Sequence, residues 1–313
     1  MSTPTTVTAD DIRAAYRRIT TRIRRTPVLE AEGAAFGAAR PVSLKLELFQ
    51  HAGSFKARGA FNNLLSRDIG PAGVAAASGG NHGIAVALAA RALSIPARIF
   101  VPEISSPAKV ARLRSLGADV VVTGAAYADA LAACEAWRAQ TGAEGVHAFA
   151  TPQTVAGQGT LAIEWERQAP DLDTLLVAVG GGGLIAGVAA HYAGRARVIA
   201  VEPERAPSLH AALAAGRPVD VEVGGVAADA LGARSVGELN FAICREHVAA
   251  SLLVPDAAIG DAQAALWRDF RIAAEPGGAT ALAALAAGVY KPGPEERVGV
   301  LVCGGNVDPA TLA

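Results

Sequence analysis

Short, almost uninterrupted apolar runs alternate with alanine-rich segments along most of the chain, and this alternation is its most constraining feature. Six runs have the length and composition of buried strands: 73–78, 97–101, 118–123, 174–179, 196–201 and 297–303. A seventh, 43–49, alternates, with Leu44, Leu46 and Leu48 on one face. Strands that are apolar throughout are typical of parallel sheets covered by helices on both faces. The sequence therefore predicts an α/β fold with mainly parallel, twisted sheets.

Length and charge limit the classes of protein to which this chain can belong. The 313 residues are too many for one ordinary core and fit two lobes, which we expect to be interleaved because no long linker divides the chain. A net charge of −1 gives no electrostatic basis for nucleic-acid binding. The apolar runs are interrupted before they could span a membrane, and the N-terminus lacks an apolar signal core, so we expect a cytoplasmic protein. The three cysteines are far apart, which argues against a disulfide framework.

Three predicted strands end in glycine-rich turns, at 78–82, 180–183 and 303–306. Ligands of open parallel sheets bind beyond the carboxyl ends of the strands, so the three turns predict one shared cleft. The turn 180–183 precedes a helix, whose free N–H groups suit a phosphate. A tight turn without a ligand is one alternative. A dinucleotide site is another, because Gly181-x-Gly183-x-x-x-Gly187 resembles a variant of that fingerprint and Glu202 could bind a ribose.

Lysine is scarce, which draws attention to Lys56. Only four of the 28 basic residues are lysines: Lys45, Lys56, Lys109 and Lys291. Lysine, unlike arginine, can lose its proton and form a Schiff base. Glycine and serine before Lys56 and Phe55 beside it predict a partly buried amine at a helix start, with a lowered pKa. We expect the other three lysines to be solvated surface charges.

Seven motifs then occur in an order that resembles one enzyme family. They are LKLELFQHAGSFKARGA around Lys56, SGGNHG (78–83), AGQGT (156–160), VGGGGLIAG (179–187), AVEP (200–203), EPGGA (275–279) and CGGNVD (303–308). Together they resemble the serine/threonine dehydratase family of fold-type II pyridoxal-phosphate (PLP) enzymes, which includes serine racemase. Cysteine synthases are less similar, because the chain lacks their Gly-Thr-Gly-Gly turn and the acid after their lysine dipeptide.

The resemblance implies a set of site residues. Lys56 would bind the cofactor as a Schiff base and abstract the substrate Cα proton. Cofactor contacts would come from Phe55, Asn81, Gly180, Gly181, Gly182, Gly183, Leu184, Glu275 and Cys303, with Asn81 at the ring hydroxyl and Cys303 facing the pyridine nitrogen. Substrate contacts would come from Ser54, Ser78, Gly79, Asn81 and His82. Two structural alternatives stay open: Ser78 as a helix cap and Cys303 as a small core residue.

The implied reaction is the dehydration of a small β-hydroxy amino acid, such as L-serine or L-threonine, to a 2-oxo acid and ammonia. A neutral thiol at Cys303 makes the cofactor ring a weaker electron sink, which favours elimination. Gly79 replaces the serine of racemase-like relatives and has no proton to give to the opposite face of the substrate. The alternatives are a 3-hydroxyaspartate dehydratase, a serine racemase, a protein of this fold that binds without turnover, and, more distantly, an NAD(P)-dependent oxidoreductase.

The resemblance also implies an organisation. A large cofactor-binding domain would comprise 1–71 and 150–313, and a small domain, 72–149, would close over the substrate. Relatives suggest a homodimer. Some relatives bind a divalent cation, Mg²⁺ or Ca²⁺, through an acid in AVEP and a second acid nearby. Glu202 retains the first acid, whereas Ala206 and Ser208 occupy the region of the second, so a cation site there is left open.

Overall fold

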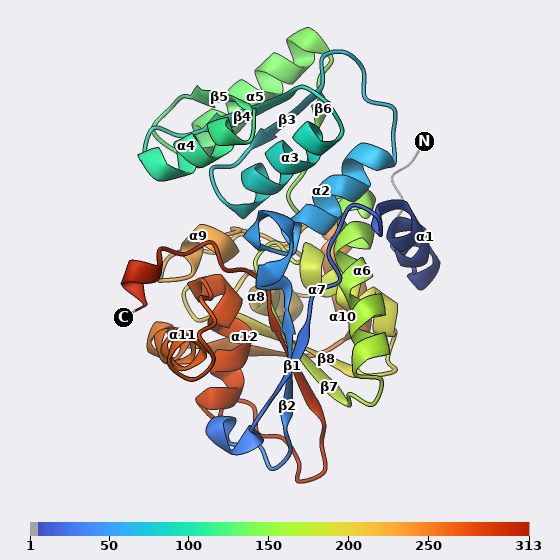
Figure 1. Ribbon diagram of the computed structural model, residues 1–313, viewed down its shortest axis with the longest axis vertical. Coiled ribbons are helices and arrows are strands. Elements are labelled where there is room, and N and C mark those ends of the chain that lie inside the picture. Colours follow the sequence, from blue (N-terminus) through green and yellow to red (C-terminus); the bar gives the residue numbers. More distant parts are fainter. Residues whose placement is uncertain (1–5, 313) are drawn as a thin grey trace.

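Two sheets organise the chain, of which the computed structural model describes residues 6–312 (Figure 1). The six-stranded sheet has the order β1-β2-β10-β7-β8-β9, and the four-stranded sheet the order β5-β4-β3-β6. Every neighbouring pair is parallel except β1 and β2. The predicted α/β fold with mainly parallel sheets is confirmed.

The elements have the following bounds. The strands are Val28–Ala31 (β1), Val42–Leu46 (β2), Val74–Ala77 (β3), Ala97–Val101 (β4), Asp119–Val122 (β5), Glu144–Gly145 (β6), Thr174–Ala178 (β7), Arg197–Pro203 (β8), Val248–Val254 (β9) and Val298–Val302 (β10). The helices are Ala9–Ile19 (α1), Lys56–Leu65 (α2), Asn81–Ala92 (α3), Pro107–Ser115 (α4), Tyr127–Thr141 (α5), Pro152–Gln168 (α6), Gly183–Tyr192 (α7), Ser208–Ala215 (α8), Ala228–Leu231 (α9), Glu238–His247 (α10), Asp256–Phe270 (α11) and Pro276–Ala286 (α12).

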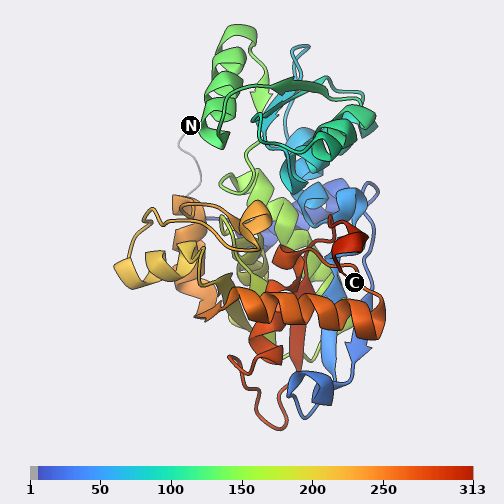
Figure 2. The same ribbon diagram turned by 90° about the vertical axis from the view of Figure 1, so that its left-hand side faces the viewer.

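The three central strands of the large sheet bring distant parts of the sequence together. Strand β10 pairs with β2 on one side and with β7 on the other. The segments that follow β2, β7 and β10 carry Lys56, the turn 180–183 and Cys303, respectively. Because these strands are parallel, their carboxyl ends lie at one edge, which faces the four-stranded sheet (Figure 2).

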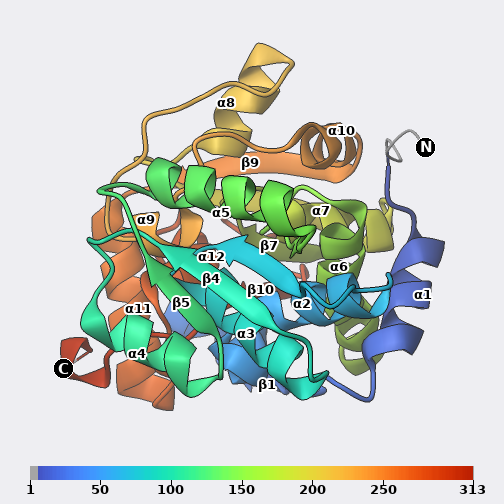
Figure 3. The same cartoon turned by 90° about the horizontal axis from the view of Figure 1, so that it is seen from above.

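The four strands of the smaller sheet all come from residues 74–145. Helix α5 covers one face of this sheet and α3 and α4 the other (Figure 3). This sheet falls within the segment predicted as the small domain. Among the described residues, no helix combines the length and apolarity that a membrane crossing requires.

The prediction for 43–49 was wrong in two respects. The strand ends at Leu46, and residues 47–49 form a 3₁₀ turn. Every residue of β2 is buried, so Lys45 is not a solvated charge. Its amine lies 2.9 Å from the Thr26 carbonyl oxygen and 3.3 Å from Glu164. An alternating pattern suggested one buried face, but a strand in the middle of a covered sheet is buried on both.

Lys45 belongs to a buried charge cluster of Lys45, Glu47, Arg58 and Glu164. The Arg58 guanidinium lies 2.7 Å from Glu47 and 2.8 Å from Glu164, and all four side chains have at most 2% of their surface exposed. Two cations face two carboxylates, so the cluster is formally neutral, as the burial of charge requires. The cluster joins β2, α2 and α6 and thereby anchors the helix that begins at Lys56.

Candidate active site

Lys56 is the first residue of α2. Its side chain enters a cavity that is lined by segments following strands of both sheets. Its amine lies 2.9 Å from the Ala148 carbonyl oxygen and 5.2 Å from the centre of the Phe55 ring. Burial lowers the pKa of Lys56 to about 8, although Glu275 opposes the shift. A larger fraction of this amine is therefore uncharged near neutral pH than for an ordinary lysine.

The turn 180–183 forms the opposite wall and leaves no room for side chains. A Cβ at Gly181 would overlap the Phe149 ring, and one at Gly183 would lie 2.7 Å from the Phe149 carbonyl oxygen. Gly182 is the N-cap of α7 and has a φ of 84°, which favours glycine. The first N–H groups of α7 have no helical acceptors, so the backbone here can receive an anion.

Asn240 supports this turn from α10. Its amide nitrogen lies 2.7 Å from the Gly181 carbonyl oxygen and 3.0 Å from that of Phe149. It therefore connects the glycine turn to the segment whose Ala148 carbonyl accepts from Lys56.

Cys303 lies on a third side of the cavity, and Glu275 lies close to it. The Cys303 thiol donates to the Gly277 carbonyl oxygen at 3.4 Å, and burial raises its pKa, so it is a neutral thiol. Burial raises the pKa of Glu275 to about 7, against a hydrogen bond of 2.6 Å from the Asn81 amide nitrogen. Gly304 must be glycine here, because a Cβ would overlap the Glu275 carboxylate.

The loop 78–82 approaches the cavity from the four-stranded sheet. Ser78 does not cap α3, whose N-cap is Gly80; its hydroxyl accepts from the Gly80 N–H at 3.3 Å. His82 donates through Nε2 to the Val146 carbonyl oxygen at 2.8 Å, and burial lowers its pKa to about 3. The His82 ring is therefore neutral, and what α3 offers an anion is the N–H groups of its first turn.

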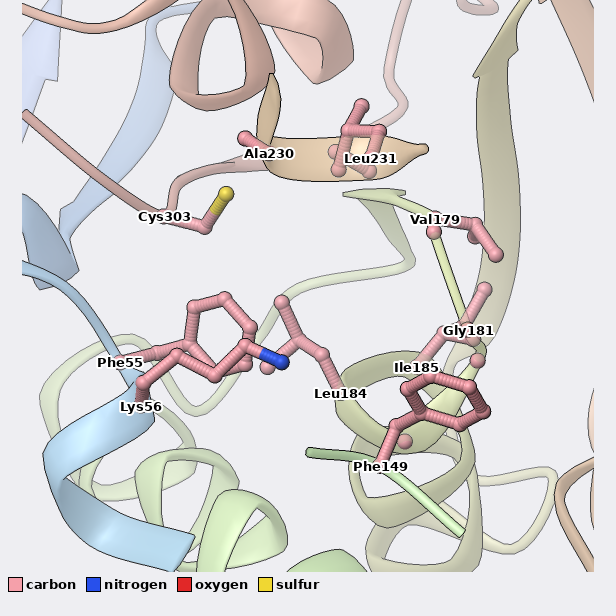
Figure 4. Close-up of a pocket in the computed structure, with 14 residues that line it drawn as sticks. Phe55, Lys56, Phe149, Val179, Gly181, Leu184, Ile185, Ala230, Leu231 and Cys303 are labelled. Carbon is pink, nitrogen blue, oxygen red and sulfur yellow. The ribbon is translucent and has the colours of Figure 1, made fainter. Parts of the chain in front are cut away.

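Phe55, Lys56, the turn 180–183, Leu184 and Cys303 line one cavity, with about 350 Å³ of empty space when the open solvent at its mouth is included. Asn81, Glu275 and the loop 78–82 lie outside this lining. Figure 4 shows the Lys56 amine directed into the cavity, with Phe55, Leu184 and Cys303 around it. The structure thus brings Phe55, Lys56, the turn 180–183, Leu184 and Cys303 together around one cavity. Ser54 is fully buried just before Phe55.

The predicted cation site at Glu202, Ala206 and Ser208 is not supported. Both Glu202 oxygens accept hydrogen bonds of 2.7 Å from the N–H groups of Leu209 and His210, in the first turn of α8. Ala206 has no ligating side chain, and the described residues contain no group of three or more His, Cys, Asp or Glu that could hold a metal ion. Glu202 therefore serves to hold α8 on the end of β8, and it is equally unavailable to a ribose.

Two glycine motifs have packing roles instead. A Cβ at Gly187 would lie 2.9 Å from the Gly159 Cα, and one at Gly157 would lie 2.7 Å from the Gly59 Cα. These glycines let α6 pack closely against α7 and α2.

Sequence reasoning missed several residues of the cavity. Phe149, Ala230 and Leu231 line it, and Asn240 supports it. None lies in a glycine turn or beside a distinctive motif, and the role of the Ala148 carbonyl belongs to the backbone. Only the fold brings them to the site.

Comparison with known proteins identifies the family. The model of a family described as pyridoxal-phosphate dependent enzyme matches residues 19–304. The chain belongs to this family.

Individual relatives agree with this assignment. Phenylserine dehydratase of Ralstonia pickettii is 40% identical over 298 residues, covering 93% of this chain and 90% of the relative. L-threonine ammonia-lyase of Thermotoga maritima is 35% identical, covering 96% and 76%, respectively. The structure of maize serine racemase superposes with a TM-score of 0.92 at 35% identity, covering 98% of this chain and 95% of that one. Because the chain belongs to this family, the alternative that the glycine turn is the cofactor site of a nicotinamide-dependent oxidoreductase is excluded.

Proposed function

We propose that this enzyme dehydrates a small β-hydroxy amino acid, such as L-serine or L-threonine, to a 2-oxo acid and ammonia. The observation that carries the proposal is the single cavity in which a lysine of lowered pKa faces a side-chain-free glycine turn and a neutral thiol. Two of the compared relatives are named for reactions of this type, phenylserine dehydratase and L-threonine ammonia-lyase.

The residues present fit pyridoxal phosphate. The turn 180–183 and the start of α7 would hold the phosphate through backbone N–H groups. Lys56 would hold the aldehyde carbon, Asn81 the ring hydroxyl, and Cys303 would face the ring nitrogen. When bound, the cofactor withdraws electrons from the substrate Cα and makes its proton acidic.

The chain's own groups would then act in sequence. The first-turn N–H groups of α3, with Ser54 and Ser78, would bind the substrate carboxylate. The Lys56 amine would accept the Cα proton, and the β-hydroxyl would leave as water with one added proton. The unsaturated amine that remains takes up water to give the 2-oxo acid and ammonia, so the water lost is recovered. Cys303, as a neutral thiol, does not hold a proton on the ring nitrogen as a carboxylate would, which favours this elimination.

A substrate panel tests the proposal. Purified holoenzyme is incubated with L-serine, L-threonine, threo-3-hydroxyaspartate, phenylserine and the D-isomers, and 2-oxo acid is measured. We expect 2-oxo acid from at least one β-hydroxy substrate and none with Lys56→Ala. Borohydride reduction followed by peptide mapping should find the cofactor on Lys56. A reduced cofactor on Lys45, Lys109 or Lys291 would contradict the site, and binding without any turnover would contradict the reaction.

The panel also separates the remaining alternatives. Preference for 3-hydroxyaspartate would identify a 3-hydroxyaspartate dehydratase, and D-serine formed from L-serine would identify a racemase. A homodimer and a cytoplasmic location stay predictions.

A further inference from the structure

The side chain of Asn306 joins three segments beside the loop that carries Lys56. Its amide nitrogen lies 2.7 Å from the Ala52 carbonyl oxygen and 2.6 Å from Asn81 Oδ1. Ala52 belongs to the loop before Lys56, Asn81 begins α3, and Asn306 follows β10. One primary amide therefore spans the lysine loop, the loop of the smaller sheet and the end of a central strand.

These contacts fix which way each amide points. A backbone carbonyl can only accept, so the nitrogen of Asn306 must face Ala52. That nitrogen also faces Asn81, so the Asn81 atom next to it must be the oxygen. The Asn81 nitrogen then faces Glu275, at 2.6 Å. A reversed Asn81 would place two NH₂ groups together and its oxygen against the Glu275 carboxylate. The Ala52 carbonyl therefore fixes the orientation of Asn306, and Asn306 fixes that of Asn81.

The surrounding backbone is shaped around this chain of amides. A Cβ at Gly53, which has a φ of 75°, would overlap the Asn306 amide. Ala52 also adopts a left-handed conformation, with a φ of 65°, which residues other than glycine rarely adopt. The Phe55 N–H donates to the Cys303 carbonyl oxygen at 3.1 Å and the Gly305 N–H to that of Gly53 at 2.9 Å. These bonds hold Asn306 beside the lysine loop.

We propose that Asn306 is a positioning residue that makes Asn81 present an N–H, and not its carbonyl oxygen, to the cofactor ring hydroxyl. The inference rests on the proposed function for the placement of Asn81 at that hydroxyl. One hydrogen of the Asn81 nitrogen is used by Glu275, and the second is left for the ring oxygen. A donor there stabilises the deprotonated ring oxygen and lowers the pKa of the hydroxyl. Asn306 thus controls the ionisation of the cofactor without touching it.

Absorption spectra of holoenzyme variants test this role. Asn306→Asp keeps the shape but places oxygen against the Ala52 and Asn81 oxygens, and Asn306→Ser removes the amide. We expect the pH at which the two absorption bands of the bound cofactor interconvert to rise, and the cofactor Kd to increase about two- to tenfold, as for one lost hydrogen bond. Asp308→Asn, an exposed change in the same loop that keeps the oxygen bonded to the Ala310 N–H, should alter neither.

Asn81→Ala provides the reference. If it changes the spectrum while both Asn306 variants match the wild type in spectrum and cofactor Kd, the positioning role is overturned. If Asn81→Ala also leaves the spectrum unchanged, Asn81 is not at the ring hydroxyl and the role of Asn306 is overturned with it. In that case, covalent cofactor on Lys56 and 2-oxo acid formation would still uphold the proposed function.

Discussion

Lys56 differs from an ordinary surface lysine in the environment of its amine. Residue type and neighbours in sequence predicted a nucleophilic lysine, and the structure adds the groups that act on it: the Ala148 carbonyl, the Phe55 ring and Glu275. Burial disfavours the charged amine, and nearby negative charge favours it. The effect of burial is the larger one, so the pKa of Lys56 is lowered. This affects the pH dependence with which the apoenzyme recombines with its cofactor.

Recombination of apoenzyme with pyridoxal phosphate should therefore level off at a lower pH than for free lysine. Only the uncharged amine attacks the aldehyde, so the rate rises with pH through the Lys56 pKa of about 8 and levels off about one pH unit above it. The appearance of the visible absorption band, followed from pH 6 to 10 and divided by the rate for N-acetyl-lysine, measures this. A normalised rate that does not decline between about pH 8 and pH 10 would show that the pKa is unshifted.

Gly79 bears on the choice between dehydration and racemisation. Its backbone is outside the left-handed region, and an added Cβ would lie 3.1 Å from Ser105 Oγ, so serine requires only a small shift. We expect wild-type enzyme to form pyruvate from L-serine with little D-serine. Gly79→Ser should gain D-serine formation, whereas Gly79→Ala, which fills the same space without a proton, should not. Chiral chromatography measures both products.

Wild-type D-serine formation at a rate comparable to pyruvate would contradict this expectation. Ser105 would then be the first residue to substitute, since its hydroxyl lies nearest to Gly79 among the neighbours of that site.

At the scale of elements, continuous apolar runs predicted β3, β4, β5, β7, β8 and β10 to within about two residues. Burial explains most of these runs, but the prediction that 118–123 is buried was wrong, because β5 is an edge strand whose residues are exposed or half-buried. A capping box of Thr8 and Asp11 begins α1. Strand β6 was missed because it has two residues, β1 because Glu30 interrupts its apolar residues, and β9 because it directly follows α10 without a glycine or proline between them. Lys45 was misassigned because no local pattern reveals that carboxylates from elsewhere in the chain will meet it.

The turn before α7 gives a prediction with a matched control. Gly182→Asp adds a negative charge to the turn that would hold the phosphate, although its Cβ would face Asn240 and Val236, so the cofactor Kd should increase at least about tenfold. Gly194 has nearly the same φ, 83° against 84°, and open space around it. Gly194→Asp therefore carries the same backbone strain away from the cavity and should keep the wild-type Kd. Equal Kd values in the two variants, from absorbance titration of the apoenzymes, would place the phosphate elsewhere.

At the scale of the whole molecule, the two sheets meet around the cavity, and an ion pair connects them at its edge. Lys109 of α4 lies 2.6 Å from Asp229 of α9, next to the cavity residues Ala230 and Leu231. Both side chains are partly exposed, so the pair contributes no more than about 1 kcal/mol. This is enough to bias the position of a small domain, if residues 72–149 close over the substrate as predicted.

Charge exchange tests this contribution. Lys109→Asp should raise KM by up to about fivefold with a smaller change in kcat, because like charges would oppose closure. The double variant Lys109→Asp with Asp229→Lys should recover most of the loss. Steady-state kinetics at low ionic strength measure both. A double variant no better than the single ones would show that the pair does not act as a pair.

The path of the chain through the smaller sheet also suggests how enzymes of this family can change substrate preference. Its first and last strands, β3 and β6, pair directly, through Val74 with Glu144 and Ala75 with Gly145. The segment from β3 to β6 therefore begins and ends at neighbouring points. Lys56, the turn 180–183 and Cys303 all lie outside this segment. A segment with adjacent ends can be exchanged between homologues as a cassette. Chimeras made at these two points should inherit substrate preference from one parent, and the cofactor-binding lysine and phosphate turn from the other.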